Sequence, residues 1–294
     1  MSAISGPRPK SHTRQAPGKL NVFLRVVGRR GDGYHEIESL VLPLSLADVV
    51  TVEVADHLVV EVRGSDVSAD AVPAGGMNLA LVAALAIAES CEGPTLGARI
   101  EIVKRIPVAA GLGGGSADAA ATLLALNEAW GCGIDQNELA AIGARVGSDV
   151  PAMLAGVPVL ASGRGERLVP VRATTTWWAV RPFGFPTRSP DAYAWWDEDG
   201  AQTGPDPGAL IAAFETANVE LLGHALFNDL QSSVCRRHPE IETVLSRFEE
   251  AGALGAIITG SGPTVVALAR NRIHAENLVA AVPGSFVVSG PPTG

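Results

Sequence analysis

The sequence has little cysteine and no paired cysteine motif. Its three cysteines, Cys91, Cys132 and Cys235, are widely spaced, odd in number and never arranged as C-x-x-C. This spacing supports neither a disulfide framework nor a zinc site. We therefore expect all three side chains to be buried thiols.

Long apolar runs and basic stripes are also missing. The longest apolar run, Leu79–Ala88, is too short to span a bilayer, and residues 1–15 lack the apolar segment of a secretory signal. The net charge of the 294 residues is -9, with no Lys/Arg stripe in the body of the chain, which argues against nucleic-acid and anionic-membrane surfaces. These absences predict a cytoplasmic protein that acts on a small molecule.

Strand-like and helix-like patterns interleave along the chain without strict alternation. Residues 16–64 alternate apolar runs with Gly, Asp and His breaks, which is typical of consecutive strands. Asn78 is suited to be the N-cap of the first helix. We predict helices over residues 78–90, 116–130, 136–146, 208–222, 239–251 and 272–281. The pattern favours an α+β fold over a doubly wound sheet, with a boundary near residue 165.

The most distinctive stretch is PVAAGLGGGSADAAATLLALNEAW, residues 107–130. Four glycines, at positions 111, 113, 114 and 115, directly precede a predicted helix that begins near Ser116. Backbone amides can surround a phosphate where no Cβ blocks the approach, and a helix N-terminus favours an anion. The stretch therefore predicts a phosphate site, with a glycine turn that only permits close packing as the less favoured alternative.

This phosphate loop does not fit the common nucleotide templates. It lacks the lysine of G-x-x-x-x-G-K-[ST], and Ser116 stands at the last position of G-x-G-x-x-G. The H-R-D, D-F-G and G-x-S-x-G signatures are absent as well. Asp118, in the first helical turn, either complements the helix dipole or meets a nucleotide through Mg²⁺. Ser116 is the other candidate metal ligand.

Three motifs resemble those of the GHMP small-molecule kinases. PVAAGLGGGSADAA is similar to the family's phosphate loop, APGKLNVFL at 16–24 to its N-terminal motif, and TGSGPTVVAL at 259–268 to its C-terminal glycine motif. They stand in the family's order from near one end of the chain to near the other. RRGDGYHEIES and GSDVP further resemble members that phosphorylate a cytidine diphosphate sugar alcohol.

The resemblance implies a two-domain α+β architecture after a flexible basic tail at 1–15. Residues 16–165 would form an ATP-binding module like the second domain of ribosomal protein S5, and residues 166–294 a ferredoxin-like module. It also implies transfer of phosphate from ATP, with Mg²⁺, to a 2-hydroxyl of the sugar alcohol by a monomer or weak homodimer. The alternatives are another GHMP kinase, of the homoserine or mevalonate type, and a nucleotide-binding module without catalysis.

The resemblance assigns Lys19 and Asp149 as the catalytic pair. Asp149 would orient the acceptor hydroxyl and accept its proton late, and Lys19 would favour the ionised form of Asp149. Without the resemblance, Asp149 fits a turn residue before Pro151, and Lys19 a solvated lysine at the start of a strand.

The remaining site residues also follow from the resemblance. ATP would be bound by the phosphate loop and by two residues toward the adenosine: Pro107, Val108, Ala109, Ala110, Gly111, Leu112, Gly113, Gly114, Gly115, Ser116 and Ala117, with Lys104 and Asn78. The acceptor would be bound by Asn21, Tyr34, His35, Thr187, Tyr193, Gly260, Ser261 and Gly262.

Tyr34 and His35 are the candidate readers of the cytosine. One stacked aromatic ring and one imidazole suit a pyrimidine, whereas the alternative is a hairpin tyrosine and a surface histidine. Trp195 and Trp196 compete with Tyr193 for the second aromatic position.

Overall fold

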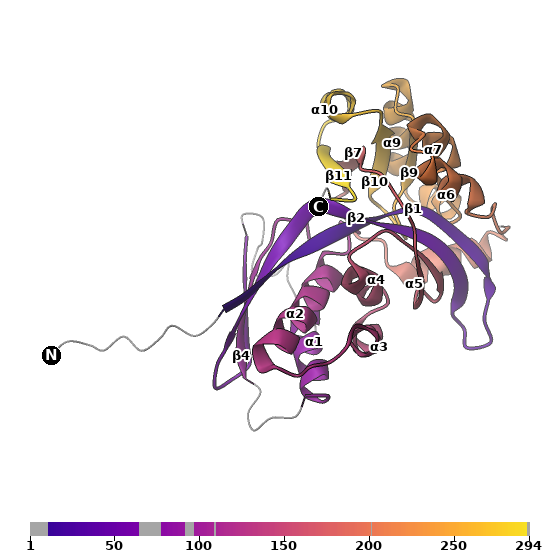
Figure 1. Ribbon diagram of the computed structural model, residues 1–294. Helices are drawn as coiled ribbons and strands as arrows, with labels where there is room; N and C mark the ends of the chain where they lie inside the picture. The colour runs from indigo at the N-terminus through magenta and orange to yellow at the C-terminus, as the bar shows by residue number, and fades with distance from the viewer. Residues whose placement is uncertain (1–10, 65–77, 92–96, 109, 201, 293–294) are drawn as a thin grey trace. The chain divides into compact units, whose positions relative to one another are not determined.

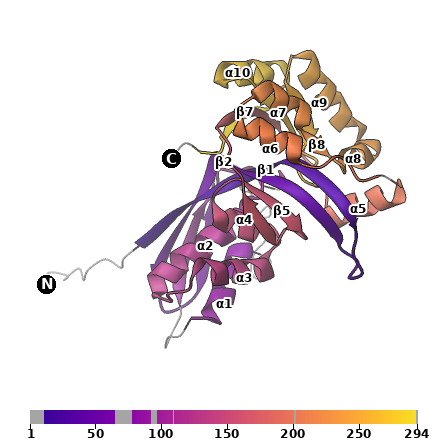
Figure 2. The same cartoon turned by 45° about the vertical axis from the view of Figure 1, so that its right-hand side comes forward.

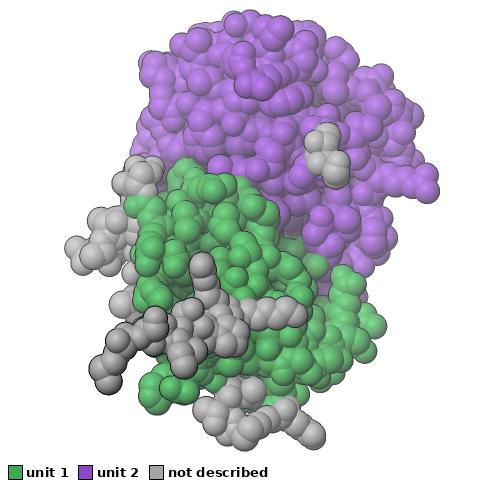
Figure 3. Space-filling view, turned by 60° about the vertical axis from the view of Figure 1, so that its left-hand side comes forward, with its two compact units in different colours: residues 1–16, 47–108, 114–154 green, residues 17–46, 109–113, 155–294 purple. Residues whose placement is uncertain are grey.

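The structure is a computed structural model that describes residues 11–64, 78–91, 97–108, 110–200 and 202–292 (Figure 1). By their contacts the residues form two compact units, coloured in Figure 3: unit 1 comprises residues 1–16, 47–108 and 114–154, and unit 2 comprises residues 17–46, 109–113 and 155–294. Two long strands, β1 (Ser11–Arg29) and β2 (His35–Val54), contribute residues to both. This division differs from a single boundary near residue 165, and that sequence boundary stays a prediction.

Unit 1 packs helices against one face of a sheet. Strand β4 (Ala98–Val103) pairs antiparallel with residues 49–54 of β2, and β3 (Val59–Arg63) pairs parallel with β4. Alternate residues of these strands join the core, as the period of two requires. Helices α1 (Leu79–Ala88), α2 (Gly114–Trp130), α3 (Gln136–Val146) and α4 (Val150–Ala155) supply most of the other buried side chains.

Most predicted helices are confirmed, and side-chain caps explain where some of them begin. Asn78 caps α1 as predicted, because its Oδ1 accepts from the backbone N–H of Ala80 at 2.9 Å. Helix α2 begins at Gly114, two residues before the expected start. The predicted helix at 208–222 is wrong in one respect: it is two helices, α6 (Gly208–Glu215) and α7 (Val219–Ala225). Asn218 separates them because it caps the second one.

Residues 11–15, expected to be part of the tail, instead lie in β1. Two of their side chains hold them against α2: His12 Nδ1 lies 3.3 Å from Glu128 Oε1, and Arg14 pairs with the same carboxylate. These contacts with a packed helix reduce the conformational freedom that a polar terminal segment would otherwise have. Residues 1–10 lie outside the described residues.

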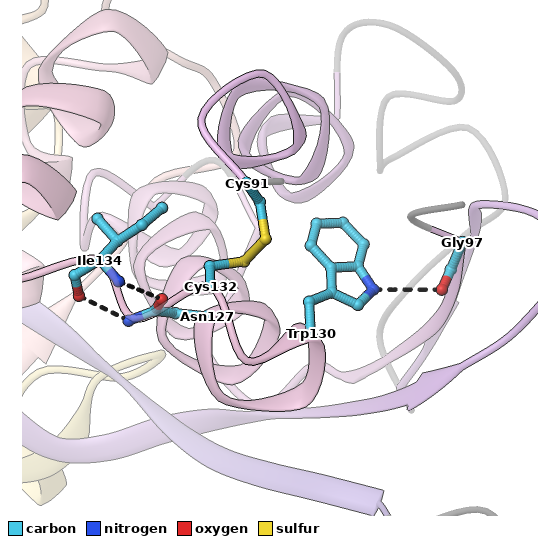
Figure 4. The surroundings of a disulfide bond; sticks show 6 residues. All are labelled: Cys91, Gly97, Asn127, Trp130, Cys132 and Ile134. Atoms are coloured by element: carbon cyan, nitrogen blue, oxygen red, sulfur yellow. Dashed lines mark hydrogen bonds between the residues drawn. A yellow bond between two sulfur atoms is a disulfide. The ribbon is translucent and has the colours of Figure 1, made fainter. Parts of the chain in front are cut away.

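The cysteine expectation is wrong for two of the three side chains. Cys91 and Cys132 form a disulfide, with their Cα atoms 5.1 Å apart, beside Trp130 and the Asn127 side chain (Figure 4). Each cysteine closely follows the C-terminal end of a helix, α1 or α2, so the bond depends on how these helices pack. A separation of 41 residues cannot reveal this packing. Cys235 is a buried thiol as expected, and burial raises its pKa to about 11.

The C-terminal part of unit 2 is ferredoxin-like, as predicted. Strands β7 (Thr176–Arg181), β9 (Gly255–Ile258), β10 (Val265–Ala269) and β11 (Phe286–Gly290) form an antiparallel sheet in the order β11-β7-β10-β9. Helices α9 (Pro239–Glu250) and α10 (Arg272–Ala281) pack against it (Figures 1 and 2). Apart from residues 189–237, which are inserted between β7 and α9, the order β7-α9-β9-β10-α10-β11 is the β-α-β-β-α-β arrangement of that fold.

Unit 2 also contains an edge hairpin and additional helices. Strand β5 (Val159–Gly163) pairs with residues 37–41 of β2 and with β6 (Arg167–Pro170), and β8 (Phe227–Asn228) pairs parallel with β1. Helices α5 (Ser189–Glu198) and α8 (Gln231–Arg237) complete the unit. The α+β fold class is therefore confirmed. Over the described residues, no helix combines the length and apolar character needed to cross a membrane.

Candidate active site

Lys19 is a buried lysine on β1 and contacts the first glycine of the phosphate loop. Its side chain donates from Nζ to Asn21 Oδ1 at 2.7 Å and to the carbonyl oxygen of Gly111 at 3.0 Å. Its backbone N–H donates to the carbonyl of Leu112 at 2.8 Å. The residue is only 6% exposed, so the alternative of a solvated lysine is wrong. The N-terminal motif and the phosphate loop meet at this ammonium group.

The glycine turn at residues 260–262 reaches the same place. A Cβ on Gly260 would lie 2.9 Å from Asn21 Oδ1 and 3.5 Å from Lys19 Nζ. Gly260 also has a φ of 60°, which disfavours any other residue. Asn21 cannot easily move aside, because its Nδ2 donates to Ser39 Oγ and its backbone N–H to Thr259 Oγ1, both at 2.7 Å.

The phosphate loop and the glycine turn also contact each other directly. A Cβ on Gly111 would lie 3.3 Å from the carbonyl oxygen of Gly262, and Thr264 Oγ1 donates to the carbonyl of Ala110. Gly111 and Gly262 both have left-handed φ values, 69° and 79°. All three motifs that resemble the GHMP kinases therefore converge around Lys19.

Asn228, which the sequence analysis missed, braces the glycine turn. Its Nδ2 donates to the carbonyls of Ile258 and Gly260, both at 2.8 Å, and its Oδ1 accepts from the backbone N–H of Leu230 at 2.9 Å. The residue is buried on β8. No pattern near it on the chain distinguishes it, because its role depends on contacts with residues 30 and 32 positions away.

In unit 1, Lys104 follows β4 and lies between two acidic side chains. Its Nζ donates to Asp118 Oδ2 at 2.7 Å and to Asp48 Oδ2. Burial by itself would lower the pKa of Lys104, but the attraction of Asp118 and Asp48 raises it above its ordinary value. Burial raises the pKa of the Asp118 carboxyl to about 7, against the opposing attraction of Lys104. We call Asp48, Lys104 and Asp118 the Lys104 cluster.

The end of the phosphate loop lies beside this cluster and beside α1. A Cβ on Gly114 would lie 3.2 Å from Lys104 Nζ, and a Cβ on Gly115 would lie 3.5 Å from Leu79 Cδ1. Leu79 directly follows Asn78, so the N-terminal ends of α1 and α2 are neighbours. Unit 1 thus brings both residues assigned to the adenosine, Lys104 and Asn78, close to the loop.

The other loop residues divide into buried and accessible positions. The buried positions are Ala110, Leu112 and Ala117. The exposed positions are Val108, Gly111 and Gly115, and those of intermediate exposure are Pro107, Gly113, Gly114 and Ser116. Gly113 has a φ of 71°. Ala109 lies outside the described residues. The exposed glycines present backbone without a side chain, as a phosphate site needs.

His35 and Tyr193, both assigned to the acceptor, are in contact. Their rings stack at 4.9 Å with an interplanar angle of 16°, and His35 Nε2 lies 3.0 Å from Asp197 Oδ1. The edge of Trp196 meets the same imidazole at 6.0 Å. The His35 side chain is 8% exposed, so the alternative of a surface histidine is wrong. Trp195 instead contacts His238.

Tyr34 and Thr187, two further residues assigned to the acceptor, also belong to unit 2. Tyr34 is 53% exposed, and the Arg164 guanidinium lies 3.6 Å from its ring centroid. Thr187 Oγ1 is buried and has no hydrogen-bond partner among the described residues. Ser261 Oγ lies 3.1 Å from Ser189 Oγ at the start of α5.

Asp149 directly precedes α4, and its carbonyl accepts from the backbone N–H of Met153 at 3.1 Å. It belongs to unit 1, whereas Lys19 belongs to unit 2. The predicted pairing of the two side chains stays a prediction.

Comparison with known proteins agrees with the three motifs. Residues 78–157 match the GHMP kinases N terminal domain, and residues 210–288 match the GHMP kinases C terminal domain. A protein of Leifsonia xyli subsp. xyli named 4-diphosphocytidyl-2-C-methyl-D-erythritol kinase is 40% identical over 94% of this chain and 93% of its own. A protein of Kineococcus radiotolerans with the same name is 40% identical over 92% of this chain and 86% of its own.

Solved structures give the same result. A crystal structure of 4-(cytidine 5'-diphospho)-2C-methyl-D-erythritol kinase superposes with a TM-score of 0.80, at 34% identity over 96% of this chain and 100% of the other. The homoserine kinase of Cytophaga hutchinsonii, at 19% identity and a TM-score of 0.73 over 99% of this chain and 97% of its own, shares the fold. The chain belongs to the GHMP kinases, a family of small-molecule kinases.

Proposed function

We propose that this kinase transfers the γ-phosphoryl group of ATP to the 2-hydroxyl of 4-diphosphocytidyl-2-C-methyl-D-erythritol. The names of its relatives at about 40% identity support this acceptor. The observation that carries the proposal is the convergence of Lys19, the phosphate loop and the glycine turn within unit 2. The same unit contains the contact between His35 and Tyr193.

The proposed mechanism relies on positioning and electrostatics. Phosphoryl transfer has a loose transition state, so the acceptor hydroxyl can lose its proton late to a carboxylate that already orients it. Asp149 is the proposed acceptor of this proton. Lys19 offsets the negative charge that develops on the transferring group. Backbone amides of the phosphate loop and the N-terminus of α2 bind the phosphates of ATP.

Mg²⁺ is proposed as the metal, bound mainly by the phosphates of ATP. Among the described residues, no group of three or more His, Cys, Asp or Glu side chains could hold a metal ion. Asp118 has only Oδ1 left for a metal, since its Oδ2 already accepts from the Lys104 ammonium. Ser116 fits better, because Mg²⁺ keeps several waters and needs few protein ligands beside substrate phosphates. When bound, Mg²⁺ neutralises charge on the β- and γ-phosphates.

The acceptor would be recognised at two places in unit 2. Tyr34, His35 and Tyr193 supply the stacking surfaces and the ring nitrogen for the cytosine. Asn21 and the amides of the glycine turn face the diphosphate and the sugar alcohol. Thr187 is proposed beside the acceptor hydroxyl, and its unpartnered Oγ1 supports that role.

We also propose a cytoplasmic enzyme that acts as a monomer or weak homodimer without a nucleic-acid or membrane partner. The net charge of -9 supports the absence of a polyanionic partner.

Turnover with a panel of acceptors tests the proposed function. The protein is incubated with Mg·ATP and, separately, with 4-diphosphocytidyl-2-C-methyl-D-erythritol, homoserine, mevalonate and galactose, and ADP release is followed. We expect ADP only with the cytidylated acceptor, together with a new phosphomonoester signal in the phosphorus NMR spectrum. Turnover of another acceptor instead would indicate a different GHMP kinase, and none at all would indicate a binding module.

A further inference from the structure

Asp48 is a buried carboxylate that the proposed mechanism does not use. It lies on β2 and is fully buried, while the side chains of Lys104 and Asp118 are each 8% exposed. A carboxylate without solvent is retained only where it is paired and hydrogen-bonded. The contacts of Asp48 therefore indicate what it stabilises.

Both oxygens of Asp48 accept hydrogen bonds from one short segment, residues 104–106. Oδ1 accepts from the backbone N–H groups of Arg105, at 2.5 Å, and Ile106, at 2.8 Å. Oδ2 accepts from Lys104 Nζ. The Asp48 carboxylate thus holds the side chain of Lys104 and the backbone of the next two residues, Arg105 and Ile106. By contrast, Asp118 has one oxygen on Lys104, and its Oδ1 has no partner among the described residues.

The held ammonium lies against the phosphate loop. It would be 3.2 Å from a Cβ on Gly114, the first residue of α2. Gly114 is not among the glycines with a left-handed φ, so side-chain packing, and not the backbone conformation, disfavours a larger residue here: a Cβ would lie 3.2 Å from Lys104 Nζ and 3.3 Å from Ile106 Cγ2. A cation beside the positive end of a helix is unfavourable by itself. The two carboxylates offset this repulsion and allow the ammonium to stay there.

We propose that Asp48 is a positioning residue for nucleotide binding, which acts through Lys104 by holding its ammonium against the N-terminal turn of α2. The inference rests on the proposed function, because it needs ATP to bind at Lys104 and this turn, as the resemblance to GHMP kinases implies. Asp48 itself touches no nucleotide. Asp118 supplies the second carboxylate of the cluster, from α2 itself.

A double-mutant cycle tests whether Asp48 acts through Lys104. The variants are Asp48→Asn, Lys104→Met and the combination of both. Binding of ADP and of a non-hydrolysable ATP analogue is measured by calorimetry without an acceptor. We expect each single variant to bind at least about 10-fold more weakly, as for loss of a charge-assisted hydrogen bond. The combined variant should bind no more weakly than Lys104→Met.

Two controls separate positioning from general damage to the fold. Glu128→Gln removes a carboxylate from the other end of α2, where it pairs with Arg14, and should change nucleotide affinity less than about 2-fold. In steady-state kinetics, Asp48→Asn should raise KM for ATP and leave KM for the acceptor unchanged. A variant that was only less stable would not produce this separation.

Two results would overturn the inference: wild-type nucleotide affinity in Asp48→Asn, or losses that add in the combined variant. If Asp48→Asn alone does not fold, the combined variant, which removes both charges, is compared with Lys104→Met. Equal affinities support the inference, and a further loss contradicts it. Because binding is measured without an acceptor, a failure to turn over the cytidylated substrate counts against the proposed function alone.

Discussion

The phosphate loop and the glycine turn both contain glycines with a left-handed φ, Gly111 and Gly113 in the loop and Gly260 and Gly262 in the turn, but the glycines at the end of the loop differ from these. In the glycine turn, Gly260 combines a left-handed φ with a Cβ position that meets Asn21, a side chain held in place by hydrogen bonds. At the end of the phosphate loop, Gly114 is restricted by the side chains of Lys104 and Ile106, and Gly115 has only an ordinary contact with Leu79. Glycine is therefore favoured by the backbone conformation at Gly260 and by side-chain packing at Gly114. At Gly115 neither reason applies.

Gly260→Ala should have the largest effect on folding and activity. The new side chain adds left-handed backbone strain to a 2.9 Å contact with Asn21. We expect a loss of about 2–4 kcal/mol in the free energy of unfolding, and a fall of at least about 100-fold in kcat/KM. Urea denaturation and steady-state kinetics measure the two effects. A variant with parental stability would show that the turn can adopt another conformation.

Asn228→Ala should have the next largest effect. It removes the amide that bridges the carbonyls of Ile258 and Gly260 and leaves the buried N–H of Leu230 without its acceptor. Unsatisfied buried groups of this kind predict a loss of about 2 kcal/mol. Thermal melting measures the loss. Asn218→Ala, which removes an asparagine side chain that caps α7, is the control and should cost about 1 kcal/mol.

Asp118→Asn should change how stability depends on pH. The pKa of Asp118 is raised from 3.8 to about 7 in the folded protein, so the folded state binds more protons than the unfolded chain within this range. The contribution of Asp118 to the free energy of unfolding should therefore fall as the pH rises from about 4 to about 7. The variant lacks this titration, so its stability relative to the parent should increase over the same range. Urea denaturation at several pH values measures the difference, and a constant difference would contradict the raised pKa.

Gly114→Ala should have a smaller effect than Gly260→Ala, because Gly114 has no left-handed φ and the new Cβ meets only side-chain atoms, of Lys104 and Ile106. These side chains must shift by a few tenths of an ångström, which we expect to cost about 1 kcal/mol. KM for ATP should rise more than KM for the acceptor. In the Lys104→Met background, Gly114→Ala should cost less stability than it does in the parent, and an equal cost would place the strain at Ile106.

Gly115→Ala should have the smallest effect on folding, and of opposite sign. Alanine has the higher helix propensity, so a gain of about 0.5 kcal/mol is expected at this exposed position in α2. ATP affinity should nevertheless fall, because the new Cβ blocks an approach to the backbone amides. Melting and calorimetry separate the two effects. Unchanged ATP affinity would remove the functional reason for glycine here.

Local patterns were sufficient for much of the fold and for part of the candidate site. Asn78 as a cap, the helix over 136–146 and the final β-strand pattern depend on residues within a few positions of one another. The three motifs likewise contain residues that meet in the fold, because the structure brings Lys19, Gly111 and Gly260 together. The sequence indicated the glycine turn but not Asn228, whose side chain bonds to it, because Asn228 lies 30 or more positions away along the chain.

The sequence by itself determined the α+β class, most helices and the resemblance to GHMP kinases. Periodicity, capping and motifs each depend on residues that are close together along the chain. Only the tertiary structure decided that Cys91 pairs with Cys132, that Asp48 pairs with Lys104 and that Tyr193 stacks on His35. These pairs are separated by 41, 56 and 158 positions along the chain. Contacts at such separations depend on how helices and strands pack, and no local preference of either residue specifies its partner.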